Sequence, residues 1–238
     1  MSSRRLKARV MHLLAGNDPD RIWAELYSLP AREVIHALFS GICRSEEPLR
    51  WHAVSAMGAS VARLADTDME AARIVMRRLL WSLNEESGGI GWGAPEALAE
   101  IMCRHNGLAD EYVHMLISYL RDDGPELFQE GNFLEHAILQ RGLLWGIGRM
   151  AEVRPEMLRE RGVAKDLLPY LEADDHAVRG LAARALGMLA AAEAVPAIER
   201  LVNDPASFSL YEGNAPRTVT VDMLAREALR RLRVEKEG

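Results

Sequence analysis

Five similar segments recur along this chain at intervals of about forty residues. They end at residues 58, 100, 148, 187 and 230, so their ends lie 42, 48, 39 and 43 positions apart. This interval is the length of a unit of two helices with a variable loop. The apolar and small residues inside each segment follow a helical period, which predicts one buried face per segment. The segments, called B helices, are Leu49–Gly58, Gly91–Glu100, Leu139–Gly148, Val178–Gly187 and Val221–Arg230.

A second amphipathic stretch precedes each B helix, and these stretches are predicted to form the A helices. Start signals support several of them, such as Asp68 before the second stretch and Pro155 at the beginning of the fourth. A single pair cannot bury its apolar stripe, whereas stacked pairs share one continuous core. The predicted A helices are Ala31–Arg44, Asp68–Leu83, Leu108–Arg121, Pro155–Glu172 and Glu193–Asn203.

The predicted fold is therefore all-α: an α-α superhelix, or α-solenoid, of about five helix pairs over residues 31–232. Residues 1–30 contain two further helical stretches, Arg4–Leu14 and Asp20–Leu29, which would cap the first pair. Phe208–Val221 is predicted to form a small β-hairpin, with Phe-Ser-Leu-Tyr and Thr-Val-Thr-Val as its strands and Glu-Gly-Asn-Ala-Pro between them. We expect residues 1–238 to form a single domain.

Composition excludes several classes of function. The net charge of −6 argues against non-specific coating of nucleic acid or anionic membrane. Charged residues interrupt every apolar stretch before it reaches the ~18–20 residues of a membrane span, and no export signal follows the basic start, so we expect a cytoplasmic protein. The two cysteines, Cys43 and Cys103, lack partners at metal-ligand spacing and are predicted to be buried thiols.

Two resemblances accompany this pattern. The segment VRGLAARALG, which follows Asp174 and Asp175, resembles the HEAT-like repeat of the phycocyanobilin-lyase type. The stretches RRLLWSLNEESGGIGWGAPEALAEI and NFLEHAILQRGLLWGIGRM resemble an uncharacterised bacterial HEAT-like family of sulfate-reducing and related anaerobes. The first resemblance implies a HEAT-like solenoid. Neither implies an activity, because such repeats serve enzymes, adaptors and assembly factors alike.

Three long insertions replace the connection from an A helix to the next B helix. They are residues 84–93, 122–135 and 204–220, while the connections from B to A stay short. In a solenoid, all A-to-B turns lie along one edge. We therefore expect the insertions to meet at that edge, called here the insertion rim, and to concentrate contacts with other molecules.

The first insertion places four glycines around Trp92, next to Glu85 and Glu86. Glycine permits positive φ and close backbone approach, so this loop can fold tightly and present Trp92 to a ligand or partner. The alternative is a plain connection in which a glutamate caps a neighbouring helix and Trp92 joins the core. A dinucleotide site is not expected, because no strand precedes the glycines.

The third B helix carries Arg141, Trp145 and Arg149 at intervals of four, which places them on one stripe. Such a stripe can bind a carboxylate or a peptide, with Trp145 as the main apolar contact and the arginines as bidentate hydrogen-bond donors. In the alternative interpretation both arginines pair with neighbouring acids and Trp145 fills space beside small residues. Likewise, Arg50 and Arg179 are expected to pair with acids of the next repeat.

No catalytic, cofactor or metal site is predicted. His52, His136 and His176 occupy unequal positions in their repeats and form no ligand ladder. Glu85, Glu86, Glu135 and His136 are the only clustered acid–base candidates, and they would serve the alternative function: an enzyme or a cofactor- or chromophore-handling assembly factor of the lyase-like HEAT class.

The favoured function is a protein-interaction scaffold or adaptor that binds a partner protein through the concave face and the insertion rim. A nucleic-acid partner is not expected, and the oligomeric state stays open. The candidate partner-binding residues are Asn84, Glu85, Glu86, Trp92, Glu96, Asn132, Glu135, His136, Gln140, Arg141, Trp145 and Arg149.

Overall fold

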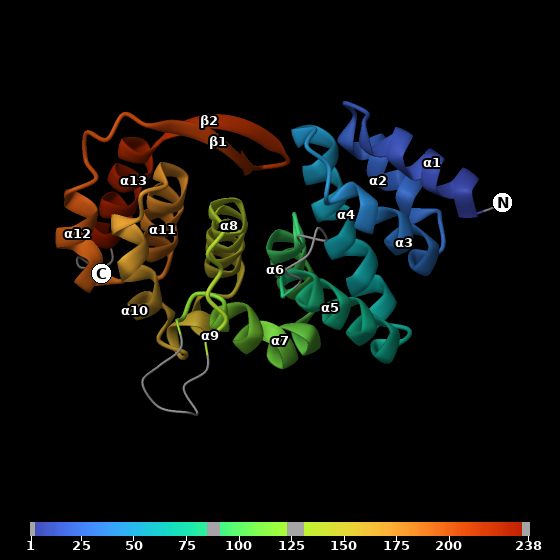
Figure 1. Cartoon of the computed structure of the whole chain (residues 1–238), viewed down its shortest axis with the longest axis horizontal. Coiled ribbons are helices and arrows are strands. Elements are labelled where there is room, and N and C mark those ends of the chain that lie inside the picture. The colour runs from blue at the N-terminus through green and yellow to red at the C-terminus, as the bar shows by residue number, and fades with distance from the viewer. Residues whose placement is uncertain (1–2, 85–90, 123–130, 235–238) are drawn as a thin grey trace. The chain divides into compact units, whose positions relative to one another are not determined.

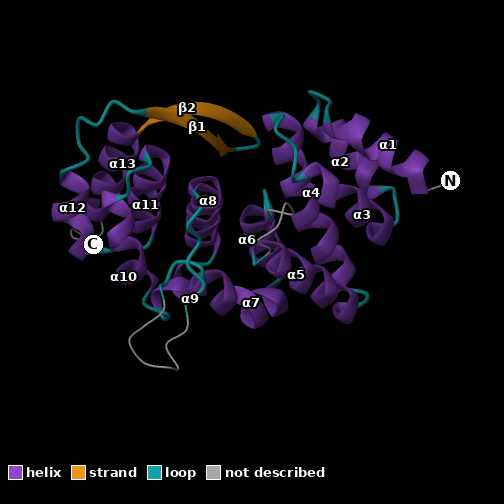
Figure 2. Ribbon diagram, in the orientation of Figure 1, coloured by secondary structure: helices purple, strands orange, loops and turns teal. Residues whose placement is uncertain are grey.

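The computed structural model describes residues 3–84, 91–122 and 131–234 (Figure 1). Within these ranges the regular secondary structure is helical apart from one pair of strands, as the colours of Figure 2 show. The backbone divides into two units, one of residues 1–113 with 211–216 and one of residues 114–210 with 217–238. The expectation of one domain over 1–238 stays a prediction.

The first unit begins with the two helices predicted as a cap and continues with A and B helices in alternation. Its elements are α1 (Ser3–Leu14), α2 (Pro19–Tyr27), α3 (Ala31–Gly41), α4 (Glu47–Ala65), α5 (Met69–Leu83), α6 (Ala94–Arg104) and the first part of α7 (Asn106–Ser118). The B helix α4 packs against α3, α5 and α6, and α1 packs against α3. This confirms the predicted pairing of helices in the first two repeats.

Small residues let the B helices of the first unit approach each other closely. A Cβ added to Gly58 of α4 would lie 2.9 Å from the Cβ of Glu100 on α6. Real Cβ atoms do not pack that closely, so glycine is required at this crossing. At the other side of α4, His52 is buried and its Nδ1 lies 2.8 Å from the carbonyl of Leu14, at the end of α1.

The second unit contains the remaining repeats. Its elements are α8 (Ala137–Val153), α9 (Pro155–Arg159), α10 (Val163–Leu167), the 3₁₀ turn η1 (Leu168–Glu172), α11 (His176–Met188), η2 (Ala192–Ala194), α12 (Val195–Glu199) and α13 (Val221–Val234). The B helix α11 packs between α8 and α13. At its end, a Cβ added to Gly187 would meet the Cα of Ala228 at 2.6 Å.

Two predicted A helices are shorter or broken. The stretch Pro155–Glu172 is not one helix, because Gly162 adopts φ +69° and divides it into α9, α10 and η1. A left-handed residue cannot continue a right-handed helix. The stretch Glu193–Asn203 yields only η2 and the short α12. The prediction of two buried thiols is also wrong for Cys43, which is exposed just after α3, whereas Cys103 is buried.

The predicted hairpin is confirmed as β1 (Ser207–Glu212) and β2 (Ala215–Thr220). Its two turn residues, Gly213 and Asn214, adopt φ +59° and +65°. Positive φ at both central residues is the requirement of a type I′ turn, whose twist matches that of the paired strands. The tip, residues 211–216, is part of the first unit.

None of the helices in the described parts of the chain has the combined length and apolar character that a membrane span requires.

Candidate interaction site

The first unit contains a cavity of about 330 Å³ bounded by α2, α4, α6 and the hairpin tip. Its aromatic wall comes from α2, where Trp23 is half-buried and Tyr27 is 66% exposed. Because residues four apart lie on one face of a helix, the cap presents both rings on the same side. Ser55 and Ser60 line it from α4, and Asn214 lines it from the turn.

Both ionisable side chains that line this cavity are arginines. Arg63 already has hydrogen-bond partners, because its two terminal nitrogens donate to the carbonyls of Tyr27 and Leu29 at 2.6 and 2.8 Å. Its guanidinium carbon also lies 4.5 Å from the centre of the Tyr27 ring. It therefore satisfies carbonyls at the end of α2. Arg104 donates through Nε to Glu100 at 3.2 Å, and its terminal nitrogens have no partner among the described residues.

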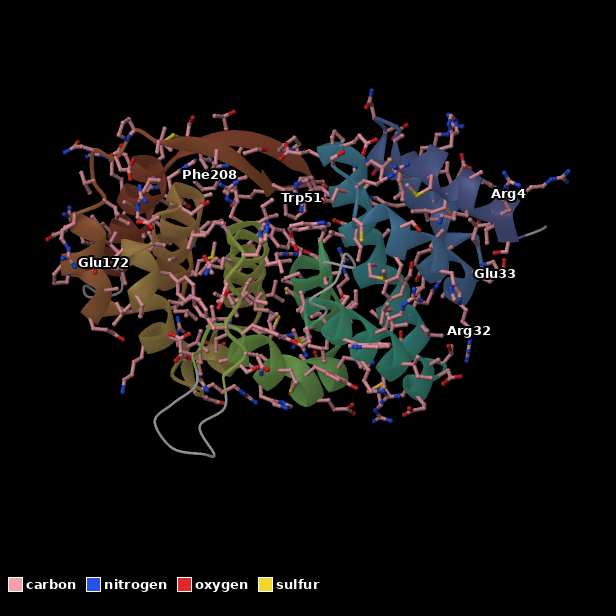
Figure 3. All side chains as sticks on the ribbon, viewed as in Figure 1. Arg4, Arg32, Glu33, Trp51, Glu172 and Phe208 are labelled. Atoms are coloured by element: carbon pink, nitrogen blue, oxygen red, sulfur yellow. The ribbon has the colours of Figure 1, made fainter. Side chains whose placement is uncertain are left out.

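The hairpin tip is fixed beside the cavity by an aromatic stack. The rings of Tyr211 and Trp51 lie 4.8 Å apart and are nearly parallel, at 4°. Trp51 of α4 is labelled in Figure 3, and the Arg50 guanidinium lies 4.4 Å from the centre of its ring. Stacked aromatic and cation–π contacts each contribute about 0.5–1.5 kcal/mol beyond the burial of area. The stack therefore holds Asn214 at the edge of the cavity.

Arg50, which lies on the Trp51 ring, also contacts Glu96 on α6. Arg50 Nη1 donates to Glu96 Oε1 at 2.8 Å, which confirms the predicted pairing of Arg50 with an acid of the next repeat. Glu96 is only 4% exposed, and its Oε2 has no hydrogen-bond partner among the described residues. Burial raises the pKa of Glu96, although the Arg50 charge opposes this effect.

In the second unit, arginines also link one repeat to the next. Arg141 of α8 makes a bidentate contact with Asp175, the N-cap of α11, with distances of 2.6 to 3.0 Å. Arg179 of α11 donates to Asp204 at 2.7 Å, as predicted. Burial acts to raise the pKa of Asp175, but Arg141 and two backbone amides outweigh it, so the pKa is lowered.

Residues 137–189 match the HEAT-like repeat family. The match runs from α8 to just beyond α11, the part of the chain in which the Arg141–Asp175 contact joins two repeats. It covers one stretch of the second unit. A search of curated proteins found no match.

Three similar solved structures agree with this assignment of fold. Two are engineered proteins, each with a TM-score of 0.53 and 17% identity; one alignment covers 98% of both chains, and the other covers 96% of this chain and 98% of the other. The third is a designed armadillo repeat protein in complex with the peptide (KR)4, with a TM-score of 0.50, 17% identity, and 94% and 98% coverage. The fold is all-α and HEAT-like, with a small hairpin.

On the HEAT-like helix α8, the stripe of Arg141, Trp145 and Arg149 makes the contacts of the alternative interpretation, in which both arginines pair with acids and Trp145 is packed. Trp145 is only 7% exposed, Arg141 pairs with Asp175, and Arg149 donates to Glu152 at 2.9 Å. Gln140 is half-buried. The stripe therefore links and packs repeats.

The remaining predicted residues lie in or beside the A-to-B connections. Glu85 and Glu86 fall outside the described residues. Asn84, Asn132, Glu135 and His136 are exposed, and Trp92 is half-buried. His136 caps α8, where its Nδ1 accepts from the amide of Ile138 at 3.2 Å. All three insertions do connect an A helix to a B helix, and their convergence into one rim stays a prediction.

Sequence reasoning missed the residues that line the cavity. Trp23 and Tyr27 were assigned to a cap, and Arg63 and Arg104 were not considered as candidates. The sequence signal for them is the spacing of Trp23 and Tyr27, four residues apart and so on one side of a helix, whereas the exposure of Tyr27 is known only from the structure. Among the described residues, no group of three or more histidine, cysteine, aspartate or glutamate side chains is arranged to hold a metal ion.

Proposed function

We propose that this protein is an interaction scaffold that binds a segment of a partner protein in the cavity between α2, α4 and the hairpin tip. The single observation that carries this proposal is the presence in one hollow of an aromatic wall and of Arg104, which bonds Glu100 through Nε while its two terminal nitrogens have no partner among the described residues. Aromatic side chains supply large contact area at low entropic cost, and a guanidinium binds carboxylates in a bidentate manner.

The chemistry of the cavity specifies the class of peptide. The free nitrogens of Arg104 suit a carboxylate, and the space between Trp23 and Tyr27 suits an apolar or aromatic side chain. Among the described residues no acidic side chain lines the cavity, although the chain as a whole carries a net charge of −6. The ligand is therefore a segment in which an acidic residue stands next to an apolar one.

The HEAT-like fold suits this role, because a rigid stack of helices is preformed and lowers the ordering cost of binding. A designed armadillo repeat protein of similar fold was solved with a peptide. From the sequence prediction we retain Asn84, Trp92, Asn132, Glu135 and His136 as secondary contacts for longer partners.

The proposal is tested with a fluorescein-labelled heptapeptide that has Asp followed by Phe at its centre, and with the matched peptide that has Asn in place of Asp. Fluorescence anisotropy on the full chain should show binding of the Asp peptide. Arg104→Gln should weaken it about tenfold, because a hydrogen bond to a charged group contributes about 1.5–3 kcal/mol. Arg21→Gln, on the solvent side of α2, should change the affinity less than twofold.

Equal binding of the Asn peptide, or equal effects of the two arginine substitutions, would contradict the proposal. So would an absence of binding by either peptide at millimolar concentration.

The finer resemblance to the phycocyanobilin-lyase type supports a second proposal, a role in handling a chromophore or cofactor. Its candidate acid–base residues in the described chain are Glu135 and His136, which are both exposed at the start of α8. His136 already accepts a hydrogen bond as the N-cap of that helix. No geometric feature favours this second role, so it rests on the sequence resemblance alone.

A further inference from the structure

A second hollow of the first unit lies between the A helices α3 and α5, on residues that the proposed peptide site does not use. It is a groove of about 180 Å³, to which α4 contributes Leu64. Ile35 and Phe39 line it from α3, and Ile74 and Val75 line it from α5. Arg32, labelled in Figure 3, stands at its edge and pairs with Asp68.

Large apolar side chains remain exposed along α5 beside this groove. Ile74 is 56% exposed and Trp81 is 68% exposed. Residues 74, 78 and 81 share one face of a helix, because three or four positions complete a turn. Single apolar residues on a surface are normal, but here an exposed isoleucine lines the groove and an exposed tryptophan lies on the same face of α5, seven residues further along.

Two arginines and one histidine line the groove: Arg32, Arg78 and His36. Arg32 is paired with Asp68, so Arg78 carries the positive charge that is open to a ligand. Arg78 packs on the Phe39 ring, with its guanidinium carbon 3.8 Å from the ring centre, and it has no acidic partner among the described residues. The other two arginines of α5 have acidic partners. Arg73 donates hydrogen bonds to Glu111 at 2.6 and 2.8 Å, and Arg77 donates one to Glu70 at 2.6 Å.

We propose that the groove between α3 and α5 docks an acidic amphipathic helix of a partner protein. A helix suits the groove because it satisfies its own backbone hydrogen bonds, and the described lining consists of helix side chains with which an extended segment could not pair as a strand. Apolar residues at helical spacing fill the groove and cover Ile74 and Trp81. Glutamates on the flanks of that helix pair with Arg78 and lie near His36.

This site is independent of the proposed peptide site, because the two share no lining residue. The proposed ligand of the groove is an acidic helix, whereas the proposed ligand of the α2–α4 cavity is a segment with one carboxylate next to an apolar side chain. A scaffold with both sites would bring two partners together.

The test uses a labelled 14-residue helical peptide with leucines on one face and glutamates beside them, and a matched peptide with lysine in place of every glutamate. Fluorescence anisotropy on the full chain should show binding of the glutamate peptide alone. Arg78→Glu should weaken binding at least tenfold, and Trp81→Ala should weaken it several-fold. Arg77→Glu, which changes the net charge equally at the adjacent residue, should change it less than threefold.

Three results would overturn the inference. They are equal binding of the lysine peptide, no binding of either peptide up to 1 mM, and equal effects of Arg78→Glu and Arg77→Glu, which would indicate unspecific attraction. Sedimentation of the chain alone adds a fourth: self-association that Trp81→Ala abolishes would assign the groove to a second copy and so exclude the proposed occupant. Circular dichroism of each variant checks that it remains folded.

Discussion

Single residues set how closely the repeats approach and how charge is buried between them. Gly58 and Gly187 stand where two B helices of one unit nearly touch, and Glu96 is buried with Oε1 paired and with Oε2 lacking a hydrogen-bond partner among the described residues. The sequence predicted the arginine links at Arg50 and Arg179, because each occupies the second position of its repeat. Burial of Glu96 was not predictable, since it depends on how α4 and α6 pack.

Replacement of Gly187 by alanine should lower the free energy of unfolding by about 1–3 kcal/mol. The new Cβ would lie 2.6 Å from the Cα of Ala228, a backbone atom that moves only with α13. This cost exceeds the gain of about 1 kcal/mol in helix propensity. Urea denaturation measures the change, and the exposed Glu193→Ala serves as the control, with an expected change within about 0.5 kcal/mol. A stabilised Gly187→Ala protein would show that the helices are not in contact there.

Replacement of Glu96 by glutamine should change how stability depends on pH. The pKa of Glu96 is raised in the folded chain, so wild type loses stability as pH rises from the ordinary pKa to the raised one. Glutamine cannot ionise. The stability of Glu96→Gln relative to wild type should therefore increase over that range, by about 1.4 kcal/mol for each unit of the shift.

Replacement of Asp175 by asparagine should change the pH dependence of stability in the opposite direction. Urea denaturation at a series of pH values measures the free energy of unfolding of both variants and of wild type. The pKa of Asp175 is lowered, so its stabilising effect is present above the ordinary pKa and is lost as pH falls through the lowered one. The deficit of Asp175→Asn relative to wild type should thus shrink in acid. The same trend with pH in both variants would contradict the assigned environments.

At the scale of elements, the hairpin is the most unusual part of this helical chain. Alternating residues and a run of turn formers predicted a hairpin here, because both are local signals. The predicted connection, Glu212–Pro216, is longer than the observed turn at Gly213 and Asn214. They did not predict what its tip contacts. Tyr211 stacks on Trp51, a residue far away along the chain, and this pairing depends on packing that no local pattern encodes.

Gly213→Val should loosen the hairpin without unfolding the helices. Gly213 has φ +59°, which is unfavourable for a β-branched residue, so the turn should be destabilised by about 1–2 kcal/mol. Hydrogen exchange of residues 207–220 should become faster while exchange in α4 stays slow. Thr218→Val places the same residue at an exposed position of β2 and should leave exchange unchanged. Faster exchange throughout α4 would contradict the prediction.

At the scale of the whole molecule, the repeat pattern predicted the fold better than the site. All five B helices, both cap helices and the hairpin form in the predicted stretches, although α6 begins at Ala94 and not at the predicted Gly91, because Gly93 precedes it with φ +75°. From the sequence, the position of Trp145 on a helix was compatible with a partner-binding anchor or with a core residue. In the structure Trp145 is only 7% exposed, because neighbouring side chains cover it. The cavity is formed by α2, α4, α6 and the hairpin tip, which are distant from one another in sequence, so only coordinates reveal it.

The central claim is that the cavity between α2, α4 and the hairpin tip holds a partner segment with an apolar side chain next to a carboxylate. A crystal structure of the chain with the Asp-Phe heptapeptide tests this most directly. The phenyl ring should lie between Trp23 and Tyr27, with the carboxylate bonded to the terminal nitrogens of Arg104. A peptide bound elsewhere on the chain, with this cavity empty, would contradict the claim.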